Sequence, residues 1–234
     1  MSSKALDFAG LVTAIREADA ALAEQASRAV NVSLTLRNWF IGYYIAEFEL
    51  QGADRATYGD KLLPELSKAL RDQSVSNSGR RQLYGYLAFY RAYPQIVRTA
   101  SALSAQVVSR PLLEEKVRTL SAQSPTAPAP DPETLISRLS YSHFEQLVEL
   151  QDPLQRRFYE VEALRGNWSV RELKRQIASQ YFQRSGLSTD KAALAKLTHA
   201  DAEPATSRQI ICDPYVFEFL GLKPQEVMGE SHLE

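Results

Sequence analysis

The sequence has little cysteine and little glycine, and it contains no long apolar run. Its single cysteine, Cys212, excludes an internal disulfide, and its three histidines match no zinc-binding spacing. No stretch approaches the ~18 consecutive apolar residues of a membrane-spanning helix, and the N-terminus MSSKALDFAG is unlike a secretory signal. We therefore expect a cytoplasmic protein without a membrane segment and without a structural metal.

Motifs of catalysis are also missing. There is no Gly-X-Ser-X-Gly nucleophile motif and no glycine-rich phosphate loop. Two Glu-X-Lys triplets, Glu114–Lys116 and Glu172–Lys174, match one part of the PD-(D/E)XK nuclease motif, but neither has the surrounding pattern that would complete a Mg²⁺ site. His143 lies near an expected helix start and is interpreted as a packing residue. The sequence thus predicts no catalytic residue and no cofactor.

The sequence contains enough apolar residues for a folded core, and its charged residues are unevenly distributed along the chain. Hydrophobic residues make up 44% of the 234 positions, and the net charge is -1. From residue 80 to 118 there are seven cations against two acids, and from 165 to 191 six against two, whereas 199–234 has seven acids against two cations. Two basic segments and an acidic tail suggest a molecule with functionally different faces.

Apolar residues near the N-terminus recur with helical spacing. Phe8, Leu11, Ile15 and Leu22 lie three, four and seven residues apart, and the pattern resumes after Val30. We predict one helix from about Asp7 to Leu50, roughly 60 Å long at 1.5 Å per residue. Its heptad-like first part extends beyond a single small core, which indicates self-association, most simply a homodimer formed through this helix.

The rest of the chain is expected to be a bundle of shorter helices. Helices near 59–72 and 80–93, joined by a polar turn, resemble a helix-turn-helix unit, and the second should end before Pro94. A Ser/Pro-rich linker at 120–131 divides the chain into 1–119, a second helical unit at 132–198, and an acidic tail with a short helix at 199–234. Five helix starts are expected in the second half: Asp131 before Pro132, Ser142 with Glu145, Asp152 before Pro153, Ser169 with Glu172, and Asp213 before Pro214.

Two of these helices have the side chains that DNA recognition requires. The first begins with Arg80, Arg81 and Gln82, while Leu83 and Leu87 anchor it to the core. Cations at a helix N-terminus oppose the helix dipole, so a bound phosphate would relieve them. The alternative interpretation is that both arginines are simply solvated.

The second candidate lies in NWSVRELKRQI. Arg171, Lys174 and Arg175 form a compact basic strip opposite the apolar set Trp168, Val170, Leu173 and Ile177. Here the alternative is that Glu172 and neighbouring acids neutralise the strip. Together with Arg80, Arg81 and Gln82 of the first helix, these three cations are the candidate contacts to double-stranded DNA.

Five strings along the chain are similar to the N-terminal region of the YhcG family of bacterial proteins. They are RAVNVSLTLRNWFIGYYI, YGDKLLPELSKAL, RRQLYGYLAFYRAYPQIVRTASA, LSYSHFEQLVELQDPLQRRFYEVEALRGNWSVRELKRQI and DPYVFEFLGL. The resemblance implies a helical, winged-helix-like domain that precedes a PD-(D/E)XK nuclease domain. The chain ends about where that nuclease domain would begin, so no catalytic residue of the family is carried over.

The combined expectation is a mainly α protein: a helical bundle with helix-turn-helix or winged-helix-like units and a long N-terminal helix. Its function would be that of a non-catalytic DNA-binding and assembly module of a bacterial nuclease, with a role in defence against foreign DNA implied by the resemblance. The alternative is a protein-interaction or oligomerisation module that does not bind DNA directly.

Overall fold

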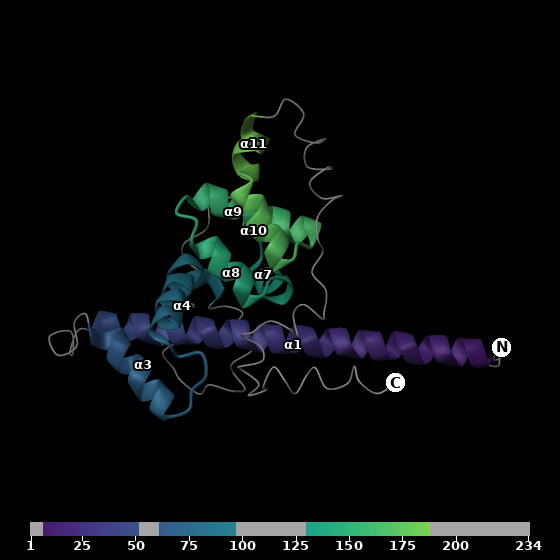
Figure 1. The fold of residues 1–234 in the computed structure, drawn as a ribbon, viewed down its shortest axis with the longest axis horizontal. Helices are drawn as coiled ribbons and strands as arrows, with labels where there is room; N and C mark the ends of the chain where they lie inside the picture. The colour runs from purple at the N-terminus through teal and green to yellow at the C-terminus, as the bar shows by residue number, and fades with distance from the viewer. Residues whose placement is uncertain (1–6, 52–60, 97–129, 188–234) are drawn as a thin grey trace.

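The computed structural model describes residues 7–51, 61–96 and 130–187, and these ranges contain helices and no strand. Figure 1 shows a bundle of short helices standing on one long helix. The elements are α1 (Phe8–Gln51), α3 (Leu62–Asp72), α4 (Arg80–Ala92), the 3-10 helix η2 (Pro94–Ile96), α7 (Pro132–Arg138), α8 (Tyr141–Val148), α9 (Pro153–Gly166), α10 (Val170–Ala178) and α11 (Tyr181–Leu187). The mainly α fold class is confirmed.

The long first helix is present as the sequence predicts. α1 runs without interruption for 44 residues, and at its start the Asp7 carboxylate accepts a hydrogen bond from the Gly10 amide at 2.7 Å. Its two halves differ in environment: residues 7–26 contribute nothing to the core, whereas Leu34, Trp39 and Tyr43 are fully buried. The N-terminal half therefore projects from the bundle, as Figure 1 shows.

The second half of α1 packs closely against α4. A Cβ atom added at Gly42 would lie 2.0 Å from the carbonyl oxygen of Tyr86, so only glycine permits this approach of the two backbones. The Trp39 indole donates a hydrogen bond to the Tyr93 carbonyl at 2.9 Å, and its ring stacks with that of Tyr43. α4 ends before Pro94, as predicted, because the residue before proline disfavours helical geometry.

Helices from both sides of residues 97–129 share a single core. α1 packs against α7 and α8, and α4 packs against α8. The buried aromatic side chains Phe89, Tyr93, Tyr141 and Phe144 join α4 to α8. Most of the expected linker and the whole 199–234 tail lie outside the described residues, so the predicted domain boundaries stay predictions.

Most of the predicted helix starts within 130–187 are confirmed. The side chains of Asp131, Asp152 and Ser169 accept hydrogen bonds from amides of the first helical turn. The prediction of a start at Ser142 is wrong, because α8 begins two residues earlier with Ser140 as its N-cap. The expected start at Asp213 lies outside the described residues.

No helix within the described ranges is long and apolar enough to cross a membrane.

Candidate nucleic-acid interface

In the second half of the chain, the basic strip of Arg171, Lys174 and Arg175 lies on the second of two helices that are joined by a three-residue turn. α9 closes on Asn167, which adopts the left-handed conformation at φ 48°, and α10 starts after Ser169, whose hydroxyl accepts a hydrogen bond from the Glu172 amide at 3.1 Å. Trp168 in the turn and Leu173 in α10 are buried, so they fix α10 to the bundle. The turn length is that of a helix-turn-helix unit.

The acidic and basic side chains of α9, α10 and α11 differ in burial. Residues 153–187 contain seven cations and three acids, and all three acids, Glu160, Glu162 and Glu172, are buried. Five cations are exposed: Arg165, Arg171, Lys174, Arg175 and Arg184. The solvent-facing charge of this part of the molecule is therefore entirely positive.

Each buried acid is held by an arginine three residues away. Arg157 contacts Glu160 at 3.3 Å, Arg165 contacts Glu162 at 3.2 Å, and Arg175 contacts Glu172 at 2.8 Å. Hydroxyl or amide donors complete each site, from Tyr93 to Glu160 at 2.7 Å, from Tyr181 to Glu162 at 3.2 Å, and from Gln176 to Glu172 at 2.6 Å. These arginines have a structural task because a buried carboxylate without a partner is costly.

Burial also shifts pKa values where Glu160 meets Tyr93. Burial raises the pKa of Glu160, although the hydrogen bond from Tyr93 and the charges of Arg157 and Arg156 oppose the shift. Burial also raises the pKa of Tyr93, and the negative charge of Glu160 adds to this shift. The pair joins η2 and the end of α4 to α9.

Among the predicted residues of α10, two have no structural task within the described part of the chain. Arg171 and Lys174 are exposed and make no ion pair or hydrogen bond with another described residue. Arg175 is also exposed, but its guanidinium holds the buried Glu172. No described residue neutralises the charge of Arg171 or Lys174, whereas Glu172 partly neutralises the charge of Arg175.

The predicted residues of α4 lie at its first turn. Arg80 and Arg81 are exposed, and the Arg80 guanidinium carbon lies 5.6 Å from the centre of the exposed Tyr84 ring. Gln82 is half-buried and folds back over Gly79, where an added Cβ would be 2.4 Å from its Oε1. The N-terminal part of α4 thus presents two cations and one aromatic ring to solvent.

α8 separates the two basic helices. It packs against α4 on one side of the core and against α10 on another. Arg80 and Arg81 on α4 and Arg171 and Lys174 on α10 therefore belong to different layers of helices, and both layers pack against α8.

The Glu-X-Lys triplet of α10 does not form a metal site. Glu172 is 2% exposed and is bound by Arg175 and Gln176, while Lys174 is exposed on the outer side of the same helix. The described ranges contain no group of three His, Cys, Asp or Glu residues that could hold a metal ion. The other triplet, Glu114–Lys116, lies outside the described residues.

His143 is more deeply placed than the sequence indicates. It occupies the third position of α8, where its Nδ1 accepts a hydrogen bond from the Ser140 amide at 3.1 Å and its Nε2 lies 3.0 Å from the Trp168 carbonyl. This arrangement requires the neutral ring with its proton on Nε2. Burial lowers the pKa of His143 to about 4. His143 joins the start of α8 to the α9–α10 turn.

Within its described residues, the chain is an all-helical module whose helices α9, α10 and α11 expose five cations and bury their three acids. Residues 14–184 match the DUF1016 N-terminal domain, so the chain belongs to this family. It is 37% identical over 216 residues to the Escherichia coli (strain K12) protein named "Putative nuclease YhcG". The match covers 88% of this chain and 54% of that relative's length. No solved structure matches the chain.

Proposed function

We propose that the chain is a DNA-binding and assembly module that positions a PD-(D/E)XK-type nuclease domain on double-stranded DNA in bacterial defence against foreign DNA. The observation that supports this proposal is the charge separation in residues 153–187, where every acid is buried and five cations are exposed. The name of the Escherichia coli relative supports the link to a nuclease. Catalysis would then belong to the half of that relative outside the match.

The physical basis of binding is neutralisation of phosphate charge. Arg171 and Lys174 lie one turn apart on α10, a spacing that lets both reach one DNA backbone while the helix faces the major groove. Arg80 and Arg81 would supply a second contact. Each phosphate neutralised releases about one counterion, so affinity should fall steeply as salt rises.

Binding to a fluorescent duplex, measured by anisotropy at several salt concentrations, tests the proposal. Replacing Arg171 and Lys174 by alanine should weaken binding at least ~10-fold and lower the slope of log K against log salt by about two. A matched control removes two exposed cations from α1, Arg16→Ala with Arg28→Ala, and changes the net charge equally. If both double variants lose the same amount of DNA affinity, binding depends on the net charge of the molecule and not on the position of Arg171 and Lys174.

Absence of binding to any duplex at ~50 mM salt would refute direct DNA binding by this chain. It would favour the alternative, a protein-interaction or oligomerisation module. The projecting half of α1, with exposed Phe8, Ile15 and Leu22, is the observation behind this second candidate.

A further inference from the structure

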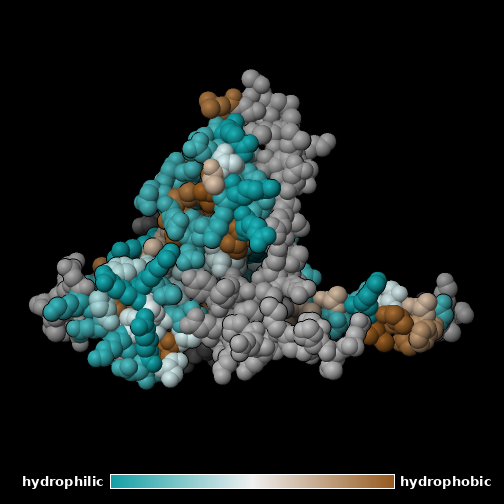
Figure 2. Space-filling view, in the orientation of Figure 1, coloured by the Kyte–Doolittle hydropathy of each residue, from teal (hydrophilic) through white to brown (hydrophobic). Residues whose placement is uncertain are grey.

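The projecting half of α1 is a helix without a tertiary partner among the described residues. Its large apolar side chains face solvent, with Phe8 80% exposed, Ile15 61% and Leu22 64%. Figure 2 shows a brown, hydrophobic patch near the projecting end of the long helix. Helices in proteins gain most of their stability by packing an apolar face, so the exposed face of this half calls for a packing partner.

Most of the exposed large apolar side chains of α1, near both ends of the helix, lie on one face. At about 100° per residue, seven of the eight exposed large apolar residues in α1 fall within a sector of roughly 100°: Phe8, Leu11, Val12, Ile15, Leu22, Tyr44 and Phe48. We call these seven residues the apolar strip. The buried Asn31, Thr35 and Trp39 point to roughly the opposite side of the helix. The core therefore does not block access to the strip.

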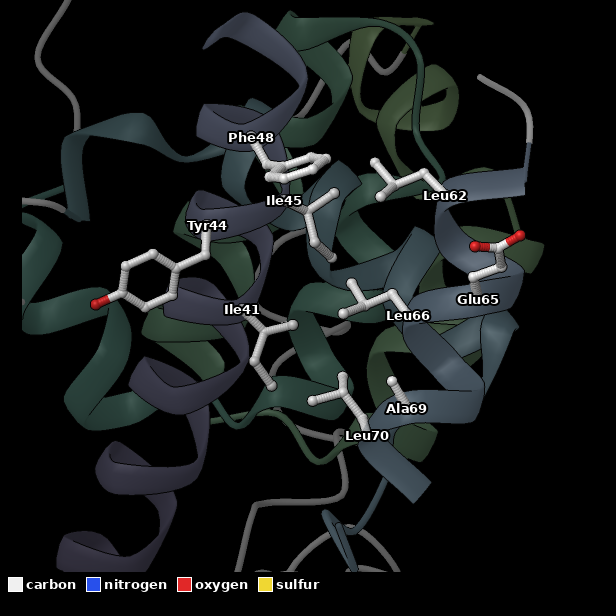
Figure 3. Close-up of a pocket in the computed structure, with 9 residues that line it drawn as sticks. All are labelled: Ile41, Tyr44, Ile45, Phe48, Leu62, Glu65, Leu66, Ala69 and Leu70. Carbon is white, nitrogen blue, oxygen red and sulfur yellow. The ribbon is translucent and has the colours of Figure 1, made fainter. Parts of the chain in front are cut away.

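The C-terminal end of the apolar strip forms one wall of a groove. The groove has a volume of about 580 Å³ and lies between α1 and α3 (Figure 3). Its lining is apolar apart from Glu65 and the Tyr44 hydroxyl: Ile41, Tyr44, Ile45 and Phe48 come from α1, and Leu62, Glu65, Leu66, Ala69 and Leu70 from α3. Among the described residues, α1 thus has an apolar helix without a packing partner at one end and an apolar groove at the other.

We propose that two copies of this chain pair through α1 in antiparallel orientation, so that the projecting half of each α1 fills the groove of the other copy. This inference develops the assembly part of the proposed function. A two-fold antiparallel arrangement satisfies both grooves and both projecting helices at once. A parallel pair would leave both grooves open.

Spacing along α1 sets the register. The two antiparallel helices rise by the same distance, about 1.5 Å per residue, in opposite directions. If Phe8 of one copy lies over Phe48 of the other, each residue therefore faces the one for which the two residue numbers add up to about 56. Val12 then meets Tyr44, and Ile15 meets Ile41. Near the two-fold axis the face carries only small or aliphatic side chains, Ala26, Ala29 and Val30, which lets the two backbones approach.

Charge and area agree with this register. It places the exposed Asp19 of one copy opposite Arg37 of the other, and the symmetry repeats this attraction. At roughly 180–200 Å² per large apolar side chain, the exposed fractions of the apolar strip amount to about 700 Å² per copy. Stable interfaces bury about 800 Å² per partner, so the strip supplies most of what a dimer needs.

Sedimentation equilibrium of the whole chain tests the association. The wild type should be a dimer at micromolar concentration, and Ile15→Asp should raise the dissociation constant at least ~100-fold because it places a charge in the seam. The control is Thr13→Asp, another exposed residue of the projecting half that lies on the side away from the strip. A monomeric wild type, or equal effects of both variants, would overturn the proposal.

Disulfide cross-linking tests the orientation. In a Cys212→Ser background, chains with Val12→Cys and chains with Tyr44→Cys should cross-link when mixed, whereas Val12→Cys chains alone should not. Cross-linking of Val12→Cys chains to one another would overturn the antiparallel pairing. DNA affinity of Arg171→Ala with Lys174→Ala is measured separately, so loss of dimerisation and loss of DNA binding can be told apart.

Discussion

Acidification should weaken the fold through His143. The ring is held neutral between the Ser140 amide and the Trp168 carbonyl, and its Nδ1 has no room to carry a second proton while it accepts a hydrogen bond. The pKa of His143 is about 4 in the folded chain, against 6.5 for an unperturbed histidine. The unfolded state therefore binds a proton more tightly than the folded state.

The sign and size of the effect follow from these two pKa values. The contribution of His143 to stability is complete above pH 6.5 and is lost as pH falls towards 4. At pH 5 the unfolded histidine is almost fully protonated and the folded one is not, which corresponds to a loss of about 2 kcal/mol relative to pH 7.5. The full difference, approached at lower pH, is about 3 kcal/mol.

Urea denaturation at pH 7.5 and at pH 5 measures this loss. The variant His143→Gln keeps an acceptor for the Ser140 amide, as in an ordinary capping box, but cannot titrate. All other side chains are the same in the two proteins, so the difference between the two pH-dependent losses isolates His143. A wild type that loses no more stability than His143→Gln between these pH values would refute the reasoning.

Other substitutions test further parts of the fold. Gly42→Ala should destabilise the chain by about 3 kcal/mol, since its Cβ would lie 2.0 Å from the Tyr86 carbonyl oxygen, and urea midpoints will show whether α1 and α4 tolerate it. Arg175→Ala should cost about 2 kcal/mol by leaving Glu172 buried without its cation, and adding Glu172→Gln should recover much of that loss in the same assay. If the double variant is as unstable as Arg175→Ala, the ion pair is not the cause.

The helical pattern was predictable because local signals determine it. Periodic apolar spacing predicted α1 almost to the residue, and proline after aspartate predicted the starts of α7 and α9. The start of α8 was missed because His143 takes the position usually held by Glu or Gln in a capping box. The histidine acts there as a hydrogen-bond acceptor, which the residue type alone does not reveal.

The candidate interface was only partly predictable, because charge counts do not report depth. The sequence shows that cations outnumber acids near α10, but not that Glu160, Glu162 and Glu172 are buried. In the sequence, Arg175 and Arg171 are equivalent members of one basic strip, although only Arg175 holds a buried carboxylate. The groove beside α1 could not be predicted either, since it depends on where α3 packs.

Burial of acids explains how a chain with a net charge of -1 can present a basic surface. An arginine paired with a buried glutamate keeps its outer edge in solvent: the side chains of Arg165 and Arg175 are 69% and 57% exposed, while their partners are almost fully buried. Acids placed inside the bundle do not repel phosphate at contact distance, yet they fix the arginines that line its surface. Such pairs would orient cations towards DNA before it binds, which lowers the entropy lost on binding. The bundle packs on the face of α1 opposite the apolar strip, so antiparallel pairing would place one such surface on each side of the two paired helices.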